Sequence, residues 1–221
     1  MAINLVNESK RPISLLDATN FANILTQYSA LVCQRYGLPI NTVAIAPARV
    51  AGQQNVVIVD QFPNPAMQKV ALGYHEMLNG SAIAYIRADA YGSRSIFGTY
   101  SPALKLKNII IHGERFTPGV ISVAAHELAE MLVDPQINRL SAPDNQGRTW
   151  LMEPCDHTVG LFRGTANLTN GVLPDFTTPT FYDDAHGTKP YSYLGVPPAP
   201  FTLVKGGYGY WKDARGVLHK L

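Results

Sequence analysis

The segment from Val123 to Asp134 constrains the fold of this chain more than any other. It reads VAAHELAEMLVD, so that His126, Glu130 and Asp134 recur at intervals of four residues. Side chains at this spacing stack along one face of an α-helix. Apolar residues occupy the other sides, which predicts a buried helix that carries a histidine and three acids. Because burial of unpaired charge is costly, these groups need partners.

A divalent cation is one such partner. Two ligands one helical turn apart can bind the same ion, and the acid beside the first ligand is placed to activate a water molecule. In this interpretation His126 and Glu130 are metal ligands and Glu127 is the general base. The second ligand is glutamate where the familiar H-E-x-x-H motif has histidine, so the pattern is less specific than that motif.

Arginines of the following loops are the alternative partners. In this interpretation the helix acids form a structural network that holds the C-terminal half in place. The candidate arginines follow the helix in the sequence: Arg139, Arg148 and Arg163.

The composition limits the function classes. Of the 221 residues, 46% are hydrophobic and 15% are charged, which fits one domain with a substantial core. The formal net charge is +2 and no dense run of lysine and arginine occurs, so we expect no nucleic-acid partner. No apolar stretch approaches the roughly 20 residues of a membrane span, so we expect no membrane partner.

The N-terminal segment and the cysteines bear on the compartment. The opening MAINLVNESKRP has no apolar core of a signal peptide, which predicts a cytoplasmic protein that leaves the cell, if at all, within a larger particle. Cys33 lies in an apolar helical pattern and is expected to be a buried thiol. A disulfide bond between Cys33 and Cys155 is the alternative.

Apolar spacing and turn residues predict helices and strands. One helix ends at Gly37. The metal-site helix is predicted to begin with Thr117 as N-cap and Pro118 in the first helical position. It should end near Val133, because the residue before Pro135 avoids helical geometry. The helix that ends at Gly37 is predicted over Asp17–Tyr36. The other predicted elements are strands over Thr42–Ala46, Asn55–Val59 and Ser81–Arg87, and a turn at Asn79-Gly80.

We therefore expect a single α+β domain over residues 1–221. Residues 1–70 would form an N-terminal α/β part, and residues 71–135 would supply a sheet and the metal-site helix. Residues 136–221 are rich in Gly, Pro and Tyr and are predicted to be irregular, with short strands and long loops.

Five stretches occur in order along the chain: Gly73–Glu76 with the strand that follows, His126–Pro135, Glu153–Asp156, Gly171–Phe181, and Pro200-Phe201 with Gly206–Tyr208. Together they resemble a family of zincin-like, metallopeptidase-like proteins of bacteria and phages with an H-E-x-x-E pattern. The match extends over about residues 70 to 210. Ala125 departs from the family, which often has serine there, and His157 stands where a small residue or proline is expected.

The resemblance implies a zincin-like fold, a small twisted mixed sheet packed on an active-site helix, and a metal cofactor. Zn²⁺ is expected, with Ca²⁺ or another divalent ion possible. Glu153 or Asp156 would complete the ligand set of the helix. Asp134 would compete as a ligand or support His126 from outside the metal shell. His157 could be an extra ligand, an electrophile or a bystander, and we favour the bystander.

For three further features of the matching region, a structural role is weighed against a functional one. The strand Ser81–Arg87 could be a sheet edge that holds a peptide by strand addition, or an ordinary core strand. His75 is expected to be a packed structural histidine. Tyr208 could hydrogen-bond an oxyanion, although aromatic residues after Gly-Gly more often pack.

Two functions follow as the leading hypotheses. The first is a metal-dependent peptidase that acts on a protein or peptide substrate through a metal-activated water. The alternative is a non-catalytic virion or tail protein of a phage, which keeps the fold and a structural or vestigial metal site. A weaker third hypothesis, a carbohydrate-binding module, requires Trp150 and Trp211 to be exposed side by side.

Overall fold

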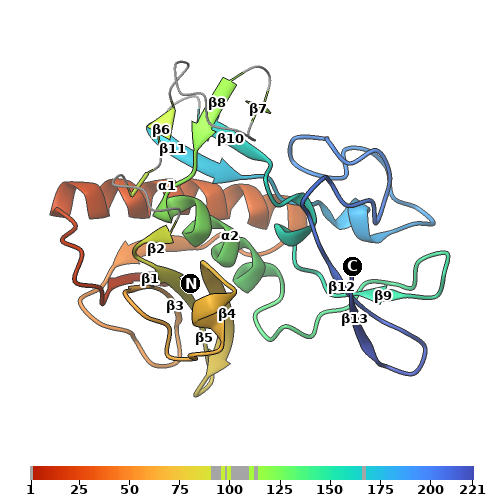
Figure 1. Cartoon of the computed structure of the whole chain (residues 1–221), viewed down its shortest axis with the longest axis horizontal. Coiled ribbons are helices and arrows are strands. Elements are labelled where there is room, and N and C mark those ends of the chain that lie inside the picture. Colours follow the sequence, from red (N-terminus) through yellow and green to blue (C-terminus); the bar gives the residue numbers. More distant parts are fainter. Residues whose placement is uncertain (1, 91–95, 98, 101–109, 112–113, 166–167) are drawn as a thin grey trace.

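The computed structural model describes residues 2–90, 96–97, 99–100, 110–111, 114–165 and 168–221 (Figure 1). The fold is α+β, with a mixed five-stranded sheet in the order β2-β1-β3-β5-β4. Strands β1, β2, β3 and β5 run parallel, and β4 is antiparallel to β5. Their bounds are β1 Ala2–Asn7, β2 Thr42–Ile45, β3 Gln54–Val59, β4 Gly73–Leu78 and β5 Ser81–Arg87.

Two α-helices pack on one face of this sheet. Helix α1 (Leu15–Tyr36) has Ser14 as N-cap, and Gly37 ends it in the left-handed conformation with φ 64°. Helix α2 (Val120–Val133) crosses under α1 and contacts β4 and β5. Alternate residues of β5, such as Ala84 and Ile86, join the core with both helices, while Tyr85 joins a smaller cluster on the opposite face.

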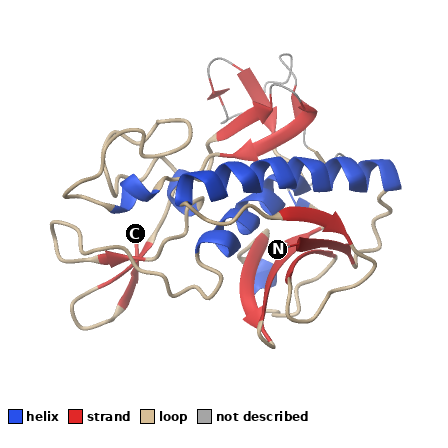
Figure 2. Ribbon diagram, turned by 180° about the vertical axis from the view of Figure 1, so that it is seen from behind, coloured by secondary structure: helices blue, strands red, loops and turns tan. Residues whose placement is uncertain are grey.

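Short strands surround this core. Figures 1 and 2 show the helices between the five-stranded sheet and a hairpin of β10 and β11, and β11 packs against α2. The remaining strands form two small three-stranded sheets, β6-β8-β7 and β13-β12-β9. The bounds are β6 Thr99–Tyr100, β7 Ile110–Ile111, β8 Glu114–Thr117, β9 Thr149–Trp150, β10 Phe162–Thr165, β11 Leu168–Pro174, β12 Tyr210–Lys212 and β13 Leu218–Lys220.

The predicted start of the metal-site helix was wrong. Thr117 pairs with Thr99 as the last residue of β8, and the helix begins only at Val120, three residues further along the chain. Gly119 is the N-cap, and its N–H donates a hydrogen bond to Ser122 Oγ at 3.1 Å. Pro118 thus lies before the helix, whereas the predicted end at Val133 is confirmed.

The suggested sheet edge at Ser81–Arg87 was also wrong. This strand is β5, which hydrogen-bonds to β3 on one side and β4 on the other. The edge strand is β4, joined to β5 by the predicted Asn79-Gly80 turn. Both turn residues have positive φ, 50° and 78°, as a two-residue hairpin of type I′ requires.

The C-terminal part has the predicted irregular character, with short strands between long loops. Cys33 and Cys155 are both buried free thiols, so no disulfide joins them. Trp150 is fully buried, which removes the exposed tryptophan pair that a carbohydrate-binding module required. Among the described helices, none has the length and apolar character needed to span a bilayer.

Candidate metal centre

Helix α2 is enclosed on nearly all sides. All of its residues are buried except His126, which is partly exposed. Gly73 of β4 makes the close packing possible, because a Cβ at this position would lie 2.5 Å from Val123 Cγ1 and 2.8 Å from Glu127 Cγ. The helix is thereby held against the edge strand, and its one accessible imidazole faces an opening.

Three side chains from two segments meet at that opening. His126 Nε2 lies 3.1 Å from Glu130 Oε1 and 3.1 Å from Asp156 Oδ1. Asp156 begins a short 3₁₀ helix, Asp156–Thr158. Ligands of one tetrahedral ion at bond lengths of about 2.1 Å are about 3.4 Å apart, so these atoms are close enough to bind one ion, at a separation that also allows hydrogen bonds.

A second group lies on the sheet side of α2. His75 Nδ1 lies 3.6 Å from Glu127 Oε2 and 4.0 Å from Glu130 Oε2. In each of the two groups, the three potential ligand atoms lie within 4.8 Å of one another. Glu130 belongs to both groups, with one carboxylate oxygen toward each histidine.

The charges in this centre are crowded and buried. Burial and the charge of Asp156 raise the pKa of Glu130 to about 8. Burial and the charge of Glu130 hold the pKa of Glu153 well above its ordinary value. Burial alone would lower the pKa of His126, but Glu130 and Asp156 outweigh it and hold that pKa well above its usual range. These buried carboxylates therefore strongly favour a cation among them.

Unsatisfied oxygens mark the same place. Within the described part of the chain, no hydrogen bond reaches either carboxylate oxygen of Glu153, and the recorded partner of Glu130 Oε1 is His126. Glu153 is 5% exposed and Glu130 is 4% exposed. Buried carboxylates without donors are costly, and a divalent cation satisfies them. The residues present thus fit a metal ion with nitrogen and oxygen ligands.

Three predicted candidates lie outside both groups: Glu153, Asp134 and His157. The Asp134 carboxylate accepts hydrogen bonds from the backbone N–H of Asn138 and of Arg139, at 2.9 and 2.8 Å, and so fixes the turn after α2. His157 is fully buried among aromatic rings, and its Nδ1 lies 2.8 Å from the carbonyl oxygen of Glu153. Burial lowers the pKa of His157 to about 4, so this imidazole is neutral and orients the Glu153 backbone.

The arginine network is not formed by the described side chains. Arg148 pairs with Asp144 at 2.7 Å, and the Arg139 guanidinium donates to the carbonyl oxygen of Val133. The side chain of Arg163 lies outside the described part. In that part, the recorded ion pairs of Glu127 and Glu130 are with histidines.

Two residues near the centre had been assigned packing roles from the sequence. His75 is one, and its Nε2 lies 3.1 Å from the carbonyl oxygen of Asp134. Tyr208 is the other: its backbone N–H donates to the Asp156 carbonyl oxygen at 3.0 Å. Burial, then the charges of Asp156 and Glu130, raise the pKa of Tyr208, so its phenol keeps its proton at neutral pH. Gly73, two residues before His75 and on the same strand face, lets α2 approach this strand, which the sequence alone did not indicate.

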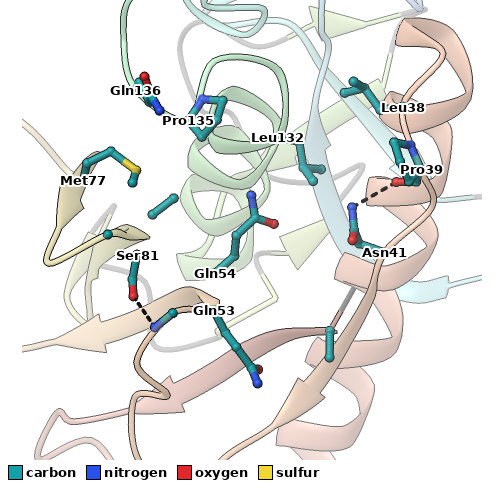
Figure 3. A pocket seen from close by; sticks show the side chains of 14 residues that line it. Leu38, Pro39, Asn41, Gln53, Gln54, Met77, Ser81, Leu132, Pro135 and Gln136 are labelled. Carbon is teal, nitrogen blue, oxygen red and sulfur yellow. Dashed lines mark hydrogen bonds between the residues drawn. The ribbon is translucent and has the colours of Figure 1, made fainter.

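A hollow of about 440 Å³ lies apart from these groups, at the amino ends of the parallel strands (Figure 3). Met77, Leu132 and Pro135 line one part of it, and Gln53 and Gln54 another. None of its lining residues is an acid, a histidine or a basic residue. The hollow therefore lacks the chemistry of the metal centre.

Comparison with known proteins gave no family model, no curated sequence and no solved structure that matches this chain.

Proposed function

We propose that the protein is a metal-dependent peptidase whose centre is His126, Glu130 and Asp156, with Glu127 as general base. The observation that carries the proposal is the pair of 3.1 Å separations from His126 Nε2 to Glu130 Oε1 and Asp156 Oδ1, beside a buried acid. The resemblance of residues 70 to 210 to zincin-like proteins supports the same assignment, and Glu153 remains the candidate for a further ligand.

A bound divalent ion would supply a Lewis acid, which lowers the pKa of water to about 7 and polarises a carbonyl group. Glu127 follows the ligand His126 directly on α2 and is 6% exposed. Its carboxylate is the group of this chain that we assign to accept the proton of the attacking water.

We assign Tyr208 the role of stabilising the oxyanion. Its phenol keeps its proton because burial and the neighbouring charges of Asp156 and Glu130 raise its pKa. A protonated phenol can donate a hydrogen bond to the oxygen that becomes negative when a peptide carbonyl is attacked.

We assign the edge strand β4 as the place where a peptide substrate binds. Only one side of β4 pairs with a strand among the described residues, namely with β5. An extended peptide can add to the free side through main-chain hydrogen bonds. Because β4 carries His75 and contacts α2, a peptide bound there would pass beside the centre.

The proposal is tested with the full chain, loaded with Zn²⁺ and incubated with casein or a peptide mixture, with cleavage followed by mass spectrometry. Glu127→Gln is expected to abolish cleavage and to leave the ion at His126, Glu130 and Asp156 bound. Glu8→Gln serves as the control, because Glu8 pairs with Arg49 away from the centre. Full activity of Glu127→Gln overturns the mechanism. Bound metal without cleavage by the wild type would favour the non-catalytic virion hypothesis.

A further inference from the structure

We propose that the protein binds a second divalent cation between His75, Glu127 and Glu130, with Glu130 bridging the two ions. This inference goes beyond the proposed peptidase activity and concerns the sheet side of α2. It starts from His75, which is 6% exposed and points from the edge strand toward the helix.

The backbone determines which imidazole nitrogen faces the acids. His75 Nε2 lies 3.1 Å from the carbonyl oxygen of Asp134, which can only accept a hydrogen bond. Nε2 therefore carries the proton, and in the neutral ring the lone pair is on Nδ1. Metal-binding histidines are commonly oriented in this way, with the second nitrogen donating to a carbonyl or carboxylate.

In the metal-free protein a protonated imidazole pairs with two carboxylates through Nδ1. Loss of that proton frees the Nδ1 lone pair, so that the imidazole and both carboxylates can bind one cation. The distances from His75 Nδ1 are 3.6 Å to Glu127 Oε2 and 4.0 Å to Glu130 Oε2. Charge-assisted hydrogen bonds of a protonated imidazole are shorter, about 2.7–2.9 Å. Ligands around one ion with bonds of about 2.1 Å are about 3.4 Å apart, which is closer to the observed spacing.

Glu130 has the geometry of a bridge. Its Oε1 lies 3.1 Å from His126 Nε2, and its Oε2 lies 4.0 Å from His75 Nδ1. One carboxylate thus offers one oxygen to each site. Two-metal centres hold their ions about 3.5–4 Å apart and commonly share ligands in this manner.

The unpartnered carboxylate of Glu153 is an independent indication that a cation binds here. It is 5% exposed, and neither of its carboxylate oxygens accepts a hydrogen bond from the described residues. Its charge acts on the same groups, because Glu130 and His75 are among the charges that shift its pKa. With one nitrogen and several oxygens, the second site would take Zn²⁺ or Mn²⁺.

The test is the metal stoichiometry of the full chain. Metal-free protein is dialysed against Zn²⁺ and analysed for bound metal. The wild type is expected to bind two equivalents, His75→Ala one, and His126→Ala one. His186→Ala is the control, because its side chain is 86% exposed, and it should bind two. One equivalent in the wild type, or two in His75→Ala, overturns the proposal.

A second measurement needs no variant and covers the case in which His75→Ala does not fold. Wild-type protein with two equivalents of Mn²⁺ is expected to give the electron paramagnetic resonance spectrum of a coupled ion pair. A spectrum of isolated Mn²⁺ alone overturns the second site. Two bound ions without peptide cleavage would contradict the peptidase proposal and leave this inference intact, whereas cleavage with one ion would do the reverse.

Discussion

His126 Nε2 and Asp156 Oδ1 lie 3.1 Å apart, although 30 residues separate them in the chain. The α2 helix presents the histidine at its one accessible position, and the first residue of a 3₁₀ helix brings the carboxylate to it. The proposed metal centre depends on this contact.

Glu130→Gln is expected to stabilise the metal-free protein and to weaken metal binding. At pH 9 the substitution removes one negative charge that burial and the charge of Asp156 disfavour, since both raise the pKa of Glu130 to about 8. Urea unfolding in the presence of a chelator measures the first effect, and Zn²⁺ titration measures the second. Lower stability of this variant in chelator would show that Glu130 is held by a structural ion pair.

The metal-free protein is expected to lose stability as the pH rises from about 5 to 9. Burial lowers the pKa of His75, but its hydrogen bond with Glu127 and the charge of Glu153 raise the pKa overall to about 9, above the ordinary 6.5. This contribution is complete below pH 6.5 and is lost as the pH rises toward 9.

Glu130 also makes the metal-free protein less stable as the pH rises. Its pKa is raised from 4.5 to about 8, so the unfolded chain releases this proton at lower pH than the folded chain does. Thermal unfolding with chelator over this pH range checks the prediction. With Zn²⁺ the trend should flatten or reverse, because metal ligands bind in their deprotonated form. A melting temperature in chelator that rises with pH would contradict the assignment.

Gly73→Ala is expected to lower the free energy of unfolding by about 1–3 kcal/mol, the usual cost of overpacking. The added Cβ would lie 2.5 Å from Val123 Cγ1, so α2 must shift away from β4. The shift would also move Glu127 and weaken metal binding. Urea unfolding and Zn²⁺ titration measure both changes. Unchanged values in both would mean that the close approach is not needed.

Tyr208→Phe is expected to reduce kcat by about 10²-fold and to leave KM and metal content unchanged, because an oxyanion donor acts mainly in the transition state. Tyr210→Phe is the matched control, since the two rings contact each other at 5.9 Å between centroids. Equal kcat values for both variants would remove Tyr208 from the mechanism.

Local sequence signals were sufficient for the elements with strong periodicity. The apolar spacing before Gly37 predicted α1, and the Asn79-Gly80 pair predicted the hairpin turn. Strand β1 was missed because Asn4 interrupts its apolar run. In the fold this asparagine is buried, and its side chain donates to Gln53 Oε1 at 3.0 Å, a partner that only the tertiary structure supplies.

Only the part of the candidate centre that lies on helix α2 could be predicted from the sequence. The spacing of four residues places His126 and Glu130 together in any α-helix. The choice between Glu153 and Asp156 depends on how an irregular loop folds, and the structure brings Asp156 to within hydrogen-bonding distance of His126. His75 could not be placed, because its position depends on the strand order β5-β4 and on the absence of a side chain at Gly73.

The claim that a divalent ion is shared by the histidine of α2 and the acids around it is tested most directly by elemental analysis. Wild-type protein and His126→Ala are purified without chelator and compared, with circular dichroism to verify folding. The account predicts bound divalent metal in the wild type and the loss of one equivalent in the folded variant. Equal metal content in both proteins, or none in either, would contradict it.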